Sequence, residues 1–320
     1  MVQPVIVIIG PTAVGKTAVG MALQDLAGGP ERARLISADS AMVYRGLDIG
    51  SAKPTPVELA RYPHDLIDIR DIADPYTAAD FVADADGCVL QARQTGRLPI
   101  IVGGTMLYVK RFVEGIAELP QADPVMRASL EEHLRERGGA ALHEELARLD
   151  PEAAAGIHPN NPQRLLRALE VVRLTGEPIS ALWQRGGGPG VADRLGGGVF
   201  VFSIEPDNRR ALHDRIEQRF DAMLEQGFMK ELDWLREELA SRDDVSDQLP
   251  ALRAVGYRQG LQHLSGEYDS AGFRRRALTA TRRLAKRQLT WLRQWQELRR
   301  LQWGEPRALA DAIAAAAGLD

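Results

Sequence analysis

The chain has 320 residues, of which 45% are hydrophobic and 26% charged, a composition typical of a globular protein with one large domain or two modest ones. Its single cysteine excludes an intrachain disulfide, and no apolar run approaches the roughly 20 residues of a membrane helix, so we expect a cytoplasmic protein with no membrane partner. The net charge is only −4, but a local charge of +9 from Arg274 to Arg307 indicates a polyanionic partner such as a nucleic acid, with a solvated basic helix face as the alternative.

A glycine-rich motif follows the first apolar run, Val5–Ile9, and precedes a predicted helix over Ala18–Leu26; the motif is Gly10-Pro11-Thr12-Ala13-Val14-Gly15-Lys16-Thr17. Strand, glycine-rich turn and helix together form the setting of a P-loop. Its glycines let backbone N–H groups turn toward phosphate oxygens, Lys16 reaches the outer phosphates, and the Thr17 hydroxyl is a ligand for Mg2+. A chance glycine turn is the alternative. The motif predicts a bound diphosphate or polyphosphate and does not identify the reaction.

Further strands and helices alternate after this motif, with strands over 33–37, 64–69, 98–102 and 199–204 and helices over 77–94 and 106–114. Asp39 and Thr105 each follow the end of a strand. If the strands are parallel, both side chains lie near the ligand of the P-loop. For Asp39, a helix-capping role is the alternative. The sequence therefore predicts an α/β fold, a P-loop NTPase-like parallel sheet flanked by helices.

Strand-like runs vanish after about residue 118, and three segments with helical spacing follow, at 123–137, 140–149 and 161–175. We expect an all-helical insertion domain over 119–198, while 1–118 and 199–320 form the α/β core with a helical C-terminal region. The glycine-rich runs 186–190 and 196–198 lack a strand–loop–helix setting, so they are interpreted as flexible loop.

The region after residue 204 is predicted to be helical. A helix over 208–226 places Arg215 and Arg219 on one face, because they are one turn apart. A loop over 249–258 combines basic, glycine and aromatic residues, which suits contact with a nucleic acid. A long basic helix follows over 274–298.

These segments resemble the IPP transferase family, the bacterial tRNA dimethylallyltransferases (isopentenyl-diphosphate:tRNA transferases). The matching segments are 10–17, 37–40, 48–54, 102–105, 161–170, 215–220, 255–258 and 285–288. The resemblance implies transfer of a dimethylallyl group from dimethylallyl diphosphate to N6 of adenosine 37, just 3′ of the anticodon, in tRNAs reading codons that begin with U. It also implies Mg2+ as cofactor, the tRNA anticodon stem-loop as partner, and a monomer.

The resemblance further implies roles for single residues. Lys16 and Arg219 would stabilise the departing diphosphate, Asp39 would take the proton from N6, and Thr105 would position the nucleotide or the diphosphate. The residues expected to contact tRNA are Asp39, Ser40, Ala41, Met42, Thr105, Arg127, Gln163, Arg164, Leu165, Leu166, Arg167, Arg253, Ala254, Val255, Gly256, Tyr257, Arg258, Lys286, Arg287 and Gln288.

A P-loop small-molecule or nucleotide kinase is the rival class, since such enzymes also place an acidic residue after the second strand. The helical insertion and the basic C-terminal helix argue against a minimal kinase. The sequence has no apolar strand ending in Asp after the third strand, and this weakens a motor or GTPase interpretation. A tRNA-binding module without catalysis would not need Lys16 and Thr17.

Overall fold

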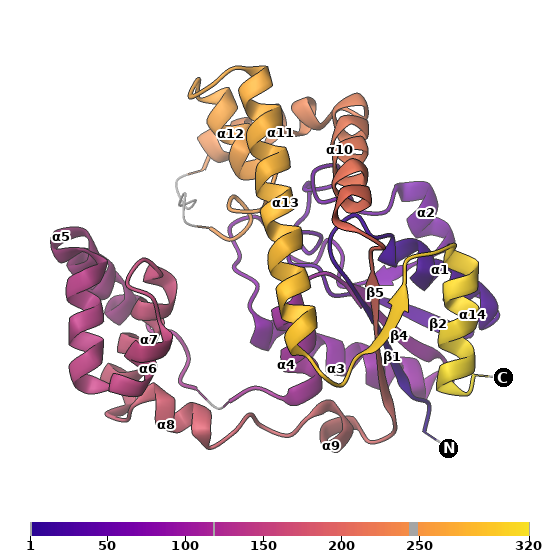
Figure 1. Ribbon diagram of the computed structural model, residues 1–320, viewed down its shortest axis with the longest axis horizontal. Helices are drawn as coiled ribbons and strands as arrows, with labels where there is room; N and C mark the ends of the chain where they lie inside the picture. Colours follow the sequence, from indigo (N-terminus) through magenta and orange to yellow (C-terminus); the bar gives the residue numbers. More distant parts are fainter. Residues whose placement is uncertain (1, 118, 243–248, 320) are drawn as a thin grey trace. The chain divides into compact units, whose positions relative to one another are not determined.

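The computed structural model describes residues 2–117, 119–242 and 249–319. Within these ranges the strands form one six-stranded sheet in the order β3-β2-β4-β1-β5-β6, with every neighbouring pair parallel (Figure 1). The strands are β1 (Val5–Ile9), β2 (Ala33–Ser37), β3 (His64–Asp65), β4 (Leu98–Gly103), β5 (Val199–Glu205) and β6 (Arg299–Gln302). The predicted α/β class, with a parallel sheet flanked by helices, is confirmed.

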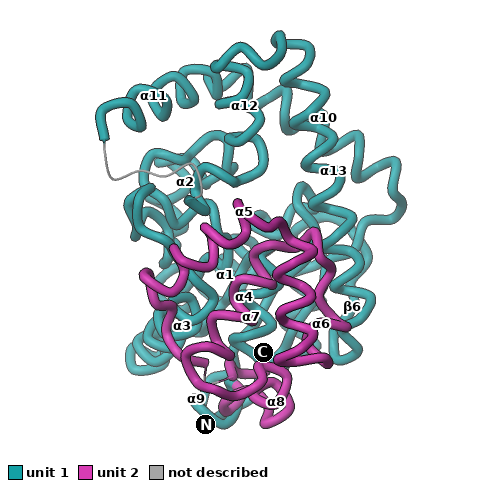
Figure 2. The backbone as a smooth tube through the Cα atoms, turned by 90° about the vertical axis from the view of Figure 1, so that its left-hand side faces the viewer, with its two compact units in different colours: residues 1–113, 191–320 teal, residues 114–190 magenta. Residues whose placement is uncertain are grey.

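The chain divides into two compact units, residues 1–113 with 191–320, and residues 114–190 (Figure 2). The helices associated with the first unit are α1 (Lys16–Leu26), α2 (Pro56–Arg61), α3 (Ala78–Gln94), α4 (Met106–Glu114), α9 (Val191–Leu195), α10 (Arg209–Glu225), α11 (Phe228–Ala240), α12 (Tyr257–Leu264), α13 (Ser270–Gln294) and α14 (Pro306–Ala317). In the described ranges, no helix combines the length and apolar character needed to cross a bilayer.

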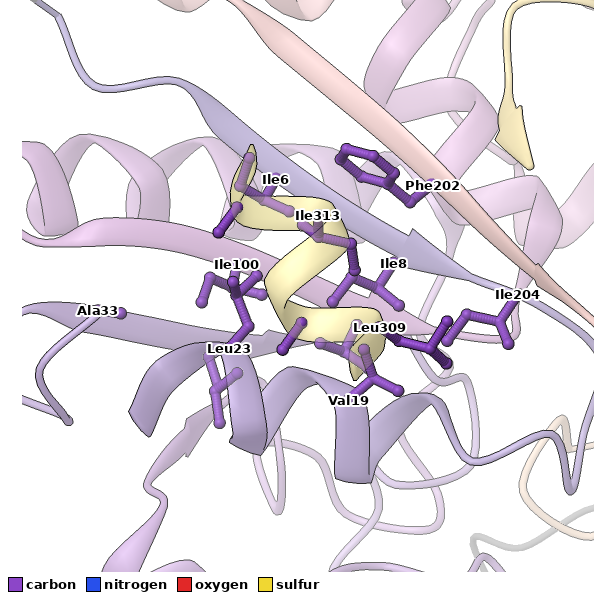
Figure 3. Packing of buried hydrophobic residues seen from close by; sticks show 14 of the residues in the cluster. Ile6, Ile8, Val19, Leu23, Ala33, Ile100, Phe202, Ile204, Leu309 and Ile313 are labelled. Atoms are coloured by element: carbon purple, nitrogen blue, oxygen red, sulfur yellow. The ribbon is translucent and has the colours of Figure 1, made fainter. Parts of the chain in front are cut away.

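The core of the larger unit lies on both faces of the sheet, as a parallel sheet requires. On one face, Ile6 and Ile8 of β1 pack with Leu23 of α1 and Ile313 of α14, and all four are fully buried (Figure 3). Side chains alternate along a strand, so Val7 points to the opposite face and is also fully buried. Each such aliphatic side chain contributes about 1.5–3 kcal/mol of transfer free energy on burial.

Two local signals fix the helices that follow the strands. Thr77 caps α3, its hydroxyl accepting a hydrogen bond from the Asp80 backbone N–H while the Asp80 carboxylate accepts one from the Thr77 N–H. Gly15 caps α1 with a left-handed backbone, φ 94°. The helix predicted over 77–94 is confirmed as α3, and α1 begins two residues earlier than predicted.

Two predictions for the sheet are wrong. Strand β3 covers two residues instead of 64–69, because Leu66 (φ 62°) and Asp68 (φ 57°) adopt left-handed backbone that cannot continue a strand. Strand β6 lies in the region predicted to be helical throughout. It is an edge strand with mostly exposed side chains, and it therefore lacks the apolar pattern that marks a buried strand.

The second compact unit contains helices alone in its described part: α5 (Pro124–Leu149), α6 (Pro151–Gly156), α7 (Pro162–Thr175) and α8 (Ile179–Gln184). Its core includes Leu130, Leu146, Leu165 and Leu169. At Gly138, φ 76° and ψ 170° interrupt α5 at the gap that the sequence predicts between two helices.

The segment 191–198, which the sequence assigned to the insertion, belongs to the larger unit in the structure. Helix α9 lies in this segment and separates the two glycine-rich runs, so the tract is not one continuous loop. Arg194 of α9 donates to Asp86 of α3 (2.7 Å) and to the Phe112 carbonyl (3.0 Å), and these bonds join α9 to the larger unit.

Candidate active site

The carboxyl ends of β2 and β4 lie against each other. The Ala38 N–H donates to the Val102 carbonyl (2.8 Å), and the Thr105 N–H donates to the Ala38 carbonyl (3.2 Å). A Cβ atom on Gly103 would lie 2.1 Å from the Ala38 carbonyl oxygen, so glycine is required for this approach. The Thr105 hydroxyl accepts from the Ser40 N–H (3.0 Å). The two loops that carry Asp39 and Thr105 are therefore bonded together.

A cavity of about 560 Å³ opens at this edge of the sheet, within the range of small-molecule sites. Its polar wall combines side chains from the P-loop motif, from the two joined loops and from α10, namely Lys16, Thr17, Asp39, Thr105 and Arg219. Its apolar wall includes Met42, Leu107, Ile216, Phe220, Leu284 and Trp291. All four predicted catalytic residues, Lys16, Asp39, Thr105 and Arg219, line this one cavity.

The P-loop motif presents backbone donors to the cavity. In the described part of the chain, the N–H groups of Gly15, Lys16 and Thr17 donate to no other group. These residues begin α1, where the helix dipole adds partial positive charge. A Cβ on Gly10 would lie 2.7 Å from the Ile204 carbonyl oxygen, so glycine lets the loop pass close to β5. The geometry is suited to an anion.

Two positively charged side chains of the cavity have few negatively charged neighbours. Lys16 Nζ donates to the Pro11 carbonyl (2.9 Å), and burial together with repulsion from Arg219 lowers the pKa of Lys16 to about 8, although Asp39 opposes the shift. Burial also lowers the pKa of Arg219, which nevertheless stays charged at neutral pH. Among the described residues, Arg219 makes no ion pair or hydrogen bond. Both side chains are only partly exposed, and charges withdrawn from water require partners, so this pair favours binding of an anion.

Asp39 makes a turn and also faces the cavity. Its Oδ1 accepts from the backbone N–H groups of Ala41 (2.9 Å) and Met42 (3.4 Å), so Asp39 fixes a turn and does not cap a helix, the alternative considered from the sequence. No hydrogen bond from the described residues reaches Oδ2. One carboxylate oxygen therefore fixes the turn, and the other is available to a ligand of the cavity.

Binding of inorganic diphosphate is expected to weaken as the pH rises above about 8. Below this pH, Lys16 is charged in both the free and the bound protein, so its contribution to the diphosphate affinity does not change with pH. Above this pH, Lys16 is neutral in the free protein and must take up a proton when the anion binds. The Kd for diphosphate therefore rises by a factor that approaches ten per pH unit. Titration calorimetry from pH 7 to 10 measures the effect. Lys16→Met is the control, because any pH dependence that comes from ionisation of the diphosphate itself is retained in this variant. Equal slopes of log Kd against pH in the two proteins would contradict the role of Lys16 in binding the diphosphate.

Several basic residues between Arg274 and Arg307 already have a partner within the protein. Arg274 pairs with Asp221 and Glu217 (both 2.8 Å), Arg282 pairs with Glu217 (3.1 Å), and Arg276 stacks on Tyr268. After the helix, Arg299 stacks on Phe200. Arg300 pairs with Glu205, and Arg307 pairs with Asp311. In the described ranges, the basic residues of this stretch without an ion pair or ring contact are Arg275, Arg283, Lys286, Arg287 and Arg293. A groove of about 420 Å³ is lined by Arg283, Lys286, Arg287, Thr290, Trp291 and Gln294.

Tyr257 is fully buried, although the sequence assigned it to the tRNA surface. Its hydroxyl donates to Glu231 (2.6 Å) and accepts from the Ser51 N–H (3.1 Å). Glu231 also accepts from the N–H groups of Asp48, Ile49 and Gly50, at 3.1, 2.7 and 3.0 Å. The motif 255–258 therefore anchors the loop after β2. Its exposed basic member is Arg258, and Arg253 just before it is also exposed.

Sequence reasoning missed Glu231, which looks like an ordinary acidic residue on a helix. We expect Glu231→Gln to lower the free energy of unfolding by about 1–3 kcal/mol, since charge-assisted hydrogen bonds to three backbone donors are weakened. Urea unfolding measures this, with Glu237→Gln as the matched change at an exposed position of the same helix. Equal stability of the two variants would show that the three contacts contribute nothing.

In the helical unit, the predicted tRNA residues divide into three groups. Leu165 and Leu166 are buried in the core, so any part they play is through the packing of α7. The buried carboxylate of Glu170 pairs with Arg167 (2.8 Å) and Arg127 (3.6 Å). The remaining two, Gln163 and Arg164, are exposed at the start of α7.

The fold and the cavity define an α/β protein with a cationic pocket at the carboxyl edge of a parallel sheet. The sequence model of the IPP transferase family matches residues 42–295, and the chain belongs to this family. A tRNA dimethylallyltransferase of Chromohalobacter salexigens is 50% identical over 291 residues, 91% of this chain and 89% of that protein.

Solved structures agree with this assignment. The full-length tRNA isopentenylpyrophosphate transferase of Bacillus halodurans is 33% identical, with a TM-score of 0.65 over 99% of this chain and 97% of the other. A eukaryotic dimethylallyltransferase acting on tRNA has a TM-score of 0.81 over 99% of this chain and 79% of its own. At 23% identity, the second likeness shows the fold alone.

Proposed function

We propose that this protein is a tRNA dimethylallyltransferase that transfers the dimethylallyl group of dimethylallyl diphosphate to N6 of adenosine 37 in tRNAs reading codons that begin with U. The observation that carries the proposal is the pair of cavity cations, Lys16 and Arg219, with Asp39 as the one carboxylate among the described residues that line the cavity. A diphosphate supplies the missing negative charge. The names of the Chromohalobacter salexigens and Bacillus halodurans relatives support this function.

Residues of the cavity are suited to each step of the proposed reaction. The diphosphate would lie on the free N–H groups of Gly15, Lys16 and Thr17, and the dimethylallyl group against the apolar wall. Attack of N6 on the allylic carbon forms the C–N bond and breaks the C–O bond to diphosphate. Lys16 and Arg219 stabilise the charge on the leaving oxygen, and Asp39 Oδ2 accepts the proton that N6 loses.

Thr17 is the residue suited to hold Mg2+. Thr17 lines the cavity, as does Lys16, and its hydroxyl makes no hydrogen bond with the described residues. Within these residues, no cluster of three or more His, Cys, Asp or Glu could hold a metal by itself. This fits Mg2+, which is commonly held by one or two protein oxygens with substrate phosphates and water. When bound, it would supply further neutralisation of the diphosphate.

The tRNA would deliver its adenine to the cavity from the side of Asp39 and Thr105. An adenine stacked in the anticodon loop must leave the stack to reach a carboxylate that lines a cavity, at a cost of a few kcal/mol. Exposed residues able to hold the displaced loop are Ser40, Arg253, Arg258, Lys286 and Arg287. Gln163 and Arg164 of the helical unit are further candidates for contact with the same tRNA.

Label transfer separates this function from that of a kinase. Purified protein is incubated with unmodified tRNA and either dimethylallyl diphosphate labelled in the allyl group or ATP labelled in the γ-phosphate. We expect label on the tRNA from the first donor alone, and none on a tRNA with guanosine at position 37. Phosphate transfer from ATP without allyl transfer would support the kinase instead.

Neutralising the groove on α13 should weaken tRNA binding and flatten its salt dependence. The variant Arg283→Ala/Lys286→Ala/Arg287→Ala removes three exposed charges from the groove. Each lost phosphate contact reduces the slope of log K against log salt by about 0.7–0.9, so a change of roughly 2–3 is expected. Filter binding at several salt concentrations measures it. The control, Arg32→Ala/Arg61→Ala/Arg307→Ala, removes equal charge from exposed residues outside the groove, and identical slopes in both variants would contradict a tRNA contact there.

A further inference from the structure

Gln288 is a buried amide that joins two loops of the active site. Its side-chain Oε1 accepts from the Thr12 backbone N–H (2.9 Å), and its Nε2 donates to the Gly104 carbonyl (2.8 Å). The residue is 7% exposed. Only this orientation of the amide satisfies both contacts, because a backbone N–H donates and a carbonyl accepts.

The place of Gln288 on its helix is unusual for a glutamine. It lies on the inward stripe of α13 with Ala285 and Leu292, both 1% exposed, at the spacing of an apolar helix face. A hydrophobic residue at this position would leave the Thr12 N–H and the Gly104 carbonyl without these partners. The neighbours Lys286 and Arg287 are exposed, so three consecutive residues divide between the interior and the surface.

The two loops that Gln288 joins carry Lys16 and Thr105 of the proposed site. Thr12 is four residues before Lys16 in the P-loop motif, and Gly104 directly precedes Thr105. A Cβ on Gly104 would lie 3.0 Å from Gln288 Nε2 and 3.4 Å from Lys16 Nζ, which shows how closely the three residues approach. A shift of about 1 Å in such a site costs roughly 10²-fold in rate.

We propose that Gln288 is a positioning residue that holds the P-loop motif and the Gly104–Thr105 loop in register for transfer, and that it does not bind tRNA. This rests on the proposed function and deepens it. Since Lys286 and Arg287 directly precede Gln288, the helix that meets the tRNA is the same helix that orders the diphosphate site.

The test compares Gln288→Met, which keeps the length of the side chain and removes both hydrogen bonds, with Gln296→Met at an exposed position just after α13. We expect the first variant to lower kcat/KM for dimethylallyl diphosphate by about 10–100-fold and to raise the Kd for inorganic diphosphate, with the Kd for tRNA within about twofold of wild type. Gln288→Glu keeps the acceptor for Thr12 but not the donor for Gly104, and should not restore activity.

Hydrogen exchange supplies a readout that is independent of transfer. The Thr12 amide should exchange faster in Gln288→Met than in wild type or Gln296→Met, because its acceptor is gone. Unchanged exchange at Thr12, or a loss of tRNA affinity with unchanged diphosphate affinity, would overturn the proposal. A wild-type protein that binds no diphosphate would contradict the proposed function, while the exchange measurement would still test the contact.

Discussion

Asp39→Asn is expected to lower kcat by about 10²–10⁴-fold with a modest change in KM for either substrate. The adenine N6 is a poor nucleophile, because its lone pair is delocalised into the ring. Attack on the allylic carbon builds positive charge on N6, and a carboxylate relieves it by accepting a proton. Both hydrogen bonds from the turn reach Oδ1 of Asp39, and no described residue donates to Oδ2, so this oxygen can accept the proton. An interaction that strengthens in the transition state lowers kcat more than it changes KM.

The same substitution separates catalysis from turn formation. Asn retains a side-chain oxygen that accepts from Ala41 and Met42, so the melting temperature should stay close to that of wild type. Single-turnover rates with saturating tRNA measure the chemical step, and Asp68→Asn controls for loss of a carboxylate outside the cavity lining. Near-wild-type kcat in Asp39→Asn would remove this residue from the mechanism and leave the turn as its role.

Lys16→Met should reduce transfer by at least about 10²–10³-fold, the usual effect of removing one donor to a developing oxyanion. The tRNA affinity should change little, because Lys16 lies in the cavity and not in the α13 groove. The unliganded variant should be as stable as wild type or more stable. Burial and the charge of Arg219 disfavour charged Lys16, so below pH 8 its removal relieves a cost.

Transfer assays, filter binding and thermal unfolding of the Lys16→Met protein test these expectations together. Lys230→Met, at an exposed lysine of α11, serves as the control for loss of a positive charge. A parallel fall in tRNA affinity and activity would show that Lys16 acts on the tRNA, and marked destabilisation of the unliganded protein would show that its charge is compensated within the fold.

The parts of the fold that could be predicted have strong local causes. Strand β1 is a run of five apolar residues, and Thr77 and Asp80 form the cap at the start of α3. The edge strand β6 could not be found in this way, since its side chains are mostly exposed and its pairing with β5 is long-range. Strand β3 ends early because of the backbone at Leu66, which apolar alternation does not reveal.

The residues of the site likewise divide into those that local sequence features predict and those that depend on long-range packing. Lys16, Asp39 and Thr105 follow strand ends, so a parallel sheet predicts that they meet. Tyr257 and Gln288 were assigned to the tRNA surface from a motif, but their neighbours in the fold turn both side chains inward. Which residue of a motif faces inward depends on how distant helices pack, and a single sequence does not contain that information locally.

Mapping the modified nucleoside tests the central claim most directly. An unmodified tRNA that reads codons beginning with U is incubated with the protein and dimethylallyl diphosphate, cleaved into defined fragments, and analysed by mass spectrometry. We predict one added dimethylallyl group, on the base of adenosine 37, and an equal amount of released diphosphate. An unmodified tRNA, or an added group at another nucleotide, would contradict the account.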